Sequence, residues 1–204
     1  MNEDFEYFLE NMGPAISKRR APPSSLARFQ GKLPDQLLAF WDEHGWCGYA
    51  DGLFWTVDPQ EYEPVLEAWI GDTPFMERDA YHVIARSAFG KLYLWGERTG
   101  DSLKVMAPGA YGFSRESIFQ GDRLDFALRL FFSNRDREEN DFADLFSPAL
   151  RRLGQLKQDE MYGFVPALAL GGSAALTHLK KVRAVEHLVL LAQLAPLQIM
   201  NPAN

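Results

Sequence analysis

The side chains that most often bind metals or carry proton transfer are scattered along this chain. The histidines lie far apart in the sequence: His44, His82, His178 and His187. They form no i, i+4 pair and no His-Glu-x-x-His pattern, so a helical zinc site is not indicated. His44 and Cys47 are three residues apart, but no second local pair accompanies them. We therefore expect structural roles for the histidines and no bound metal.

A nucleophilic or phosphate-binding motif is not indicated either. The chain has no Gly-x-Ser-x-Gly elbow, and no Walker lysine follows Gly172-Ser173. A helix cap is the better interpretation of Ser173, although backbone N–H groups there could bind an anion. Cys47 is the single cysteine, which excludes a disulfide within the chain. The sequence predicts no catalytic residue, no cofactor and no enzymatic activity.

One segment instead combines aromatic and acidic side chains in a way that favours partner binding. Its aromatic residues are Trp41, Trp46, Tyr49, Phe54 and Trp55, interleaved with Asp42, Glu43, Asp51 and Asp58. Core positions are expected for Trp41 and Trp55. Trp46 and Tyr49 flank a glycine-containing turn, and we expect them to be exposed anchors for a partner.

Carboxylates are plentiful, and most are expected to lie on solvated helix faces or caps. A dense acidic surface complements a basic partner such as a nuclease, whose own surface is built to bind phosphate. The segment 134–141 adds a second charged stretch. The predicted partner-binding residues are Trp46, Tyr49, Asp51, Asp58, Glu61, Glu138 and Glu139.

Helices and short strands must position these groups. Apolar spacing predicts helices over residues 4–12 and 34–44, and Asp58-Pro59 predicts the start of another. Residues 17–25 are expected to be an exposed connector. Strand patterns at 81–88, 91–96, 103–107 and 110–113 predict an antiparallel sheet of about four strands. After Gly121 the pattern is mainly helical, including residues 173–195, and the tail to Asn204 is expected to be loosely held.

The predicted fold class is therefore α+β. N-terminal helices and a small antiparallel sheet are followed by a mainly helical C-terminal module packed against them. We place the division between residues 1–118 and 119–204, where the pattern changes without a flexible linker.

The overall charge constrains the partner. The net charge of −7 disfavours nucleic-acid binding and attracts basic proteins. Short basic clusters occur at residues 18–20 and 180–183, and a solvated surface is the better interpretation of both. The first ten residues are acidic, unlike a signal peptide, and no apolar run approaches the roughly 20 residues of a membrane span. We expect a cytoplasmic protein.

Two stretches resemble known families. Residues 33–59 (LPDQLLAFWDEHGWCGYADGLFWTVDP), with 85–90 (ARSAFG) and 94–96 (LWG), resemble the GAD-like domain. Residues 159–172 (DEMYGFVPALALGG), continued through 182–194, resemble the C-terminal domain of Tdi-type immunity proteins. The resemblance covers most of the chain between residues 4 and 194.

The resemblance implies a bacterial immunity protein that neutralises a cognate type VI secretion DNase effector without catalysis. Such an inhibitor would block the DNA cleft of the toxin or distort its catalytic centre. Two alternatives stay open at this point. One is an enzyme with a cleft between the two modules, and the other is a nucleic-acid-binding regulator that uses the basic clusters.

Overall fold

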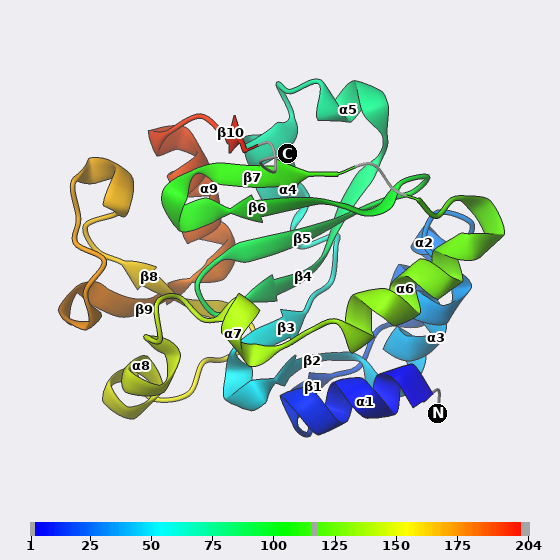
Figure 1. Ribbon diagram of the computed structural model, residues 1–204, viewed down its shortest axis with the longest axis horizontal. Helices are drawn as coiled ribbons and strands as arrows, with labels where there is room; N and C mark the ends of the chain where they lie inside the picture. The colour runs from blue at the N-terminus through cyan, green and yellow to red at the C-terminus, as the bar shows by residue number, and fades with distance from the viewer. Residues whose placement is uncertain (1–2, 116–117, 201–204) are drawn as a thin grey trace.

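The computed structural model describes residues 3–115 and 118–200. Over these residues the chain forms an eight-stranded sheet in the order β1-β2-β3-β4-β5-β6-β7-β10 (Figure 1). Its strands are β1 (Ile16–Arg19), β2 (Trp46–Tyr49), β3 (Phe54–Thr56), β4 (Tyr81–Ser87), β5 (Lys91–Gly96), β6 (Gly100–Met106), β7 (Tyr111–Ser114) and β10 (Gln198–Ile199). Neighbouring strands are antiparallel except β10, which runs parallel to β7.

A second, smaller ladder pairs β8 (Glu160–Phe164) with β9 (Leu179–Arg183). It is joined to the large sheet by a hydrogen bond in which Tyr162 N–H donates to the carbonyl of Ala88 at 2.8 Å. The turn before β5 approaches this ladder closely. Gly90 there has φ of +87°, and a Cβ on it would lie 2.9 Å from the terminal methyl of Met161. Glycine is therefore needed for both the backbone conformation and the close approach.

The helices lie on either side of the sheet. They are α1 (Glu3–Met12), α2 (Pro23–Phe29), α3 (Asp35–His44), α4 (Glu63–Ile70), α5 (Phe75–Arg78), α6 (Leu124–Ser133), α7 (Arg137–Asn140), α8 (Phe146–Leu153) and α9 (Ala184–Leu194). Helices α1, α3 and α6 gather at the lower right of Figure 1, whereas α8, α9 and the small ladder lie at the left. Helix α4 packs against α9, where the indole N–H of Trp69 donates to the carbonyl of Leu188 at 3.1 Å.

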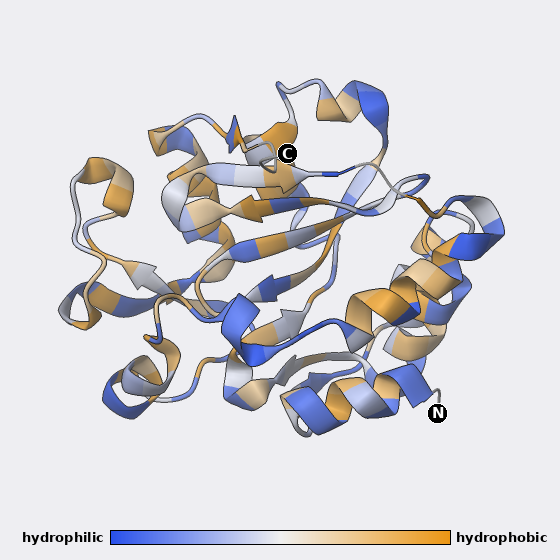
Figure 2. Ribbon diagram, viewed as in Figure 1, coloured by the Kyte–Doolittle hydropathy of each residue, from blue (hydrophilic) through white to orange (hydrophobic). Residues whose placement is uncertain are grey.

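An aromatic core joins these layers. Figure 2 shows apolar residues concentrated along the central strands and α6. Phe5 of α1 meets Phe40 of α3 and Phe132 of α6 at ring-centroid distances of 4.7 and 5.9 Å. The helix predictions at residues 4–12 and 34–44 and the predicted return to helix after Gly121, at residues 123–133, are confirmed by α1, α3 and α6, because each presents a regular apolar stripe to this core. In the described part of the chain, no helix has the length and apolar character to cross a membrane.

The predicted layout is wrong. The expectation was an N-terminal half with about four strands and a mainly helical C-terminal module, but strands from both ends of the chain complete one large sheet. The segment 17–25, expected to be a connector, contains most of β1 and the start of α2, and the C-terminal segment supplies β9 and β10. Strand β10 pairs with β7 through only Gln198 and Ile199. It is therefore defined by its partner strand, because two residues are too few to show an alternating apolar pattern in the sequence.

The predicted division between residues 1–118 and 119–204 stays a prediction, and residues 201–204 of the expected loose tail lie outside the described part. Contacts nevertheless cross that division at several points.

Candidate functional site

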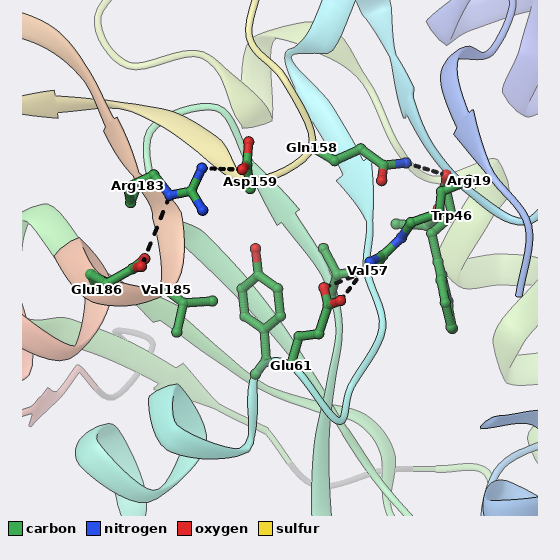
Figure 3. A pocket seen from close by; sticks show the side chains of 11 residues that line it. Arg19, Trp46, Val57, Glu61, Gln158, Asp159, Arg183, Val185 and Glu186 are labelled. Atoms are coloured by element: carbon green, nitrogen blue, oxygen red, sulfur yellow. Dashed lines mark hydrogen bonds and ion pairs between the residues drawn. The ribbon is translucent and has the colours of Figure 1, made fainter. Parts of the chain in front are cut away.

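A cleft of about 460 Å³ opens where β1 to β3 meet the segment before β8 and the start of α9 (Figure 3). It draws on segments more than a hundred residues apart in sequence. Its lining residues are Arg19, Trp46, Thr56, Val57, Glu61, Tyr62, Gln158, Asp159, Arg183, Val185 and Glu186.

One wall of the cleft carries a bidentate ion pair. The guanidinium of Arg19 donates to the two carboxylate oxygens of Glu61 at 2.5 and 2.9 Å, and it lies 4.9 Å from the ring centroid of Trp46. These hydrogen bonds to Glu61 raise the pKa of Arg19. About half of the Glu61 side chain is exposed, so a partner can reach this pair.

The facing wall carries a second set of charges. Arg183, at the end of β9, bonds to Asp159 and approaches Glu186 of α9 at 3.9 Å. These side chains are 64, 49 and 70 % exposed. Exposed ion pairs of this kind contribute about 0–1 kcal/mol to stability, so the ions can exchange their partners at little cost.

A buried arginine links the segments that carry the two walls. Arg86 of β4 is fully buried and donates to the hydroxyl of Tyr62 at 2.7 Å and to the carbonyls of Gln158 and Glu160 at 2.7 and 2.8 Å. The side-chain amide of Gln158 in turn donates to the carbonyls of Ser17 and Trp46 at 2.6 and 2.7 Å. This network holds the segment before β8 against β1, β2 and β4.

Three of the predicted partner-binding residues lie at or beside this cleft. Trp46 and Glu61 line it, and Asp58 lies on the same loop as Glu61. Asp58 does not begin a helix as expected: its carboxylate accepts from the N–H of Gln60 at 3.0 Å, and α4 starts only at Glu63. Burial raises the pKa of Asp58, and the charge of Glu61 adds to that effect.

The expectation that Trp46 and Tyr49 are exposed anchors is wrong. Trp46 is 2 % and Tyr49 1 % exposed, because β2 is an inner strand between β1 and β3. The ring of Tyr49 packs edge-on against Phe8 of α1 at 4.8 Å. The glycine-containing turn thus links two core strands rather than displaying aromatic rings.

The remaining predicted residues lie elsewhere. Asp51 is exposed and lies 3.6 Å from Arg137, and Glu138 is exposed on α7. Glu139 faces the sheet, where Lys91, Lys104 and Arg135 surround it at 2.6, 3.1 and 3.2 Å. Burial opposes ionisation of Glu139, but the three cations prevail and hold its pKa at about 2. The predicted residues therefore do not form one surface, and their role in partner binding stays a prediction.

Comparison with known proteins matches two segments of the chain. The family model of the GAD-like domain matches residues 3–109, more than half of the chain. This chain belongs to the GAD-like domain family. The family model described as "T6SS immunity protein Tdi1, C-terminal" matches residues 125–195, as the motif at 159–172 indicated, and associates the chain with type VI secretion immunity proteins.

The same arrangement of elements occurs in a solved structure. The crystal structure of Atu4351 from Agrobacterium tumefaciens superposes with a TM-score of 0.88 at 21 % sequence identity. The match covers 98 % of this chain and 93 % of that one, and it shows that the two proteins share a fold. No curated protein matches this chain.

The cleft lies across the two matched segments. The GAD-like domain supplies Arg19, Trp46 and Glu61, and the Tdi1-type segment supplies Asp159 and Glu186. Within residues 3–115 and 118–200, no three His, Cys, Asp or Glu side chains gather in a way that could hold a metal ion. The arrangement is suited to exchanging ion pairs with charged groups of a partner.

Proposed function

We propose that this immunity protein binds a nuclease effector of a type VI secretion system at the cleft and thereby neutralises it. The observation that carries the proposal is that each matched segment supplies one wall of the cleft. A partner seated there contacts both segments at once. This accounts for the occurrence of both domains in one chain.

The charge of the cleft supports a basic partner. Its lining holds three carboxylates, Glu61, Asp159 and Glu186, against two guanidinium groups among the described residues. All three acids are about half exposed or more, so lysine or arginine side chains of the effector can compete for them. The net charge of −7 makes the electrostatic potential of the whole protein negative as well, so it attracts a basic protein from a distance.

The acidic lining favours a block of the DNA-binding surface over a distortion of the catalytic centre. In a block, the carboxylates stand where DNA phosphates would otherwise bind. The association rate then falls steeply with added salt, because screening removes the steering. An association rate with little dependence on salt supports distortion instead.

The test pairs this protein with the product of the gene next to its own, as the candidate effector. Co-purification, a binding isotherm and inhibition of DNA cleavage are measured for the native chain and for E61Q/D159N/E186Q. We expect the triple variant to weaken binding at least tenfold, because buried interfacial charges that lose their partners cost about 2–5 kcal/mol. E77Q is the matched control, since Glu77 is exposed on α5 and does not line the cleft.

The outcomes separate the function from its location. If the native chain neither binds the neighbouring gene product nor protects against it, the proposed function is wrong. If the triple variant binds and protects as well as E77Q does, the function stands and the cleft is not the binding site. Circular dichroism of each variant verifies that the fold is retained.

A further inference from the structure

Two further cavities lie between β6, β7 and α6, away from the cleft. Their volumes are about 400 and 570 Å³, and they have four lining residues in common: Asp101, Lys104, Arg115 and Glu139. Lys91 lines the first cavity and Arg135 the second. The two cavities therefore meet at one charged junction.

Positive charge is in excess at this junction. Among the residues that the structure describes, the cations Lys91, Lys104, Arg115 and Arg135 face the carboxylates of Glu139 and Asp101. Glu139 is shared by three of these cations, and Asp101 bonds to Arg115 at 2.9 Å. The described side chains thus leave two positive charges uncompensated, in a protein whose net charge is −7.

Two of these cations are held deep in the fold. The side chains of Lys91 and Arg135 are only 7 and 4 % exposed. The guanidinium of Arg135 lies 4.7 Å from the ring centroids of both Tyr93 and Phe131, which meet edge-on. Its Nη1 is buried without a hydrogen bond, although it lies 3.2 Å from a carboxylate oxygen of Glu139. Burying cations is costly unless anions compensate them, and here the single carboxylate of Glu139 is shared by both buried cations, which leaves room for a further anion.

The walls beside the charged junction are partly apolar. Met106 and Phe113 border the first cavity, and Ile118 and Phe131 border the second. Phe113 is 43 % and Ile118 80 % exposed, although both are large apolar residues. A ligand with an anionic head and an apolar body matches this combination.

We propose that this junction binds a small phosphate monoester, with the dianionic head between Lys104, Arg115 and Arg135 and an apolar group against Phe113 or Ile118. A phosphate carries two negative charges, which matches the excess among the described side chains, and its oxygens accept hydrogen bonds from the forked donors of arginine. Burial lowers the pKa of Lys91 to about 8, against the opposing effect of Glu139, and a bound dianion raises that pKa again. This site is independent of the cleft and of the proposed effector.

The test uses phenyl phosphate and inorganic phosphate as probes. Their binding to the native chain is measured by calorimetry and by phosphorus NMR. We expect saturable binding of one phenyl phosphate per chain. K104Q/R115Q is expected to weaken it about tenfold per cation removed, as for a charged hydrogen bond. K180Q/R28Q is the matched control, because it also removes two exposed cations. These two residues are far from the junction in sequence and line neither cavity.

Each outcome decides the proposal. Binding that is weakened in K104Q/R115Q and retained in K180Q/R28Q supports the proposal. Tighter binding of phenyl phosphate than of inorganic phosphate shows that the apolar wall contacts the phenyl group. Equal affinity for the two probes overturns the monoester and leaves a site for free phosphate. No saturable binding, or the same weakening in both double variants, overturns the site itself. Lys104 and Arg115 are partly exposed, so both substitutions are expected to leave the fold intact.

Discussion

Replacing Arg86 by methionine is expected to destabilise the protein by about 3 kcal/mol. The substitution keeps much of the side-chain volume but removes the donors to the Tyr62 hydroxyl and to the carbonyls of Gln158 and Glu160. Each buried acceptor left without a donor costs about 1–3 kcal/mol. Part of that sum is recovered, because the unfavourable desolvation of a buried guanidinium disappears.

The free energy of unfolding is measured by urea titration, with tryptophan fluorescence and circular dichroism as the two signals that monitor unfolding. The matched control is R28M, since Arg28 is half exposed and its ion pair with Glu63 contributes less than about 1 kcal/mol. Hydrogen exchange adds a local readout: the amides of residues 158–164 are expected to exchange faster in R86M. Unfolding midpoints that are equal in R86M and R28M, with unchanged exchange at 158–164, would refute the assignment of Arg86 as the link between the two matched segments.

Three further predictions concern single positions. Gly90→Ala is expected to lower stability by more than about 1 kcal/mol, because alanine is strained at positive φ and its methyl group would meet Met161; urea titration measures this. The folded-state pKa of Glu139 is depressed to about 2, so its contribution is present above the unfolded pKa near 4.5 and is lost as the pH falls toward 2. Acid titration of the native chain against E139Q tests this, and a difference that does not shrink over that range contradicts it. Cys47 is fully buried and burial raises its pKa, so a thiol reagent is expected to label it only after denaturation.

Local periodicity was sufficient for the elements that bury one regular face. The helices α1, α3 and α6 and the hairpin of β4 and β5 follow from their apolar spacing and from a turn at Phe89-Gly90. Residues 173–195 carry a helical stripe only from Ala184 onward, and the first part forms β9 against β8. A strand that is defined by a distant partner leaves little trace in its own residues.

The candidate site shows the same limit. Glu61 was predicted from its acidity, but its partner Arg19 belongs to a segment that looked like a polar connector. Asp159 was part of the familiar motif without a role attached to it. Trp46 lines the cleft, but it does so from a buried strand and not as the exposed anchor that was expected. Which charges face each other depends on tertiary contacts that the spacing of one sequence does not contain.

The network around Arg86 also constrains how relatives of this protein can exchange parts by recombination. A chimera that joins the GAD-like segment of one protein to the C-terminal segment of another inherits its arginine and its acceptor loop from different parents. The backbone carbonyls of residues 158 and 160 can accept from any parent that keeps the arginine at the same depth. The side chain of Gln158 must also suit the foreign β1 and β2, because it donates to carbonyls of both strands. We therefore expect functional chimeras to carry residues 16–62 and 158–186 from one parent, so that the two stretches are inherited as a unit.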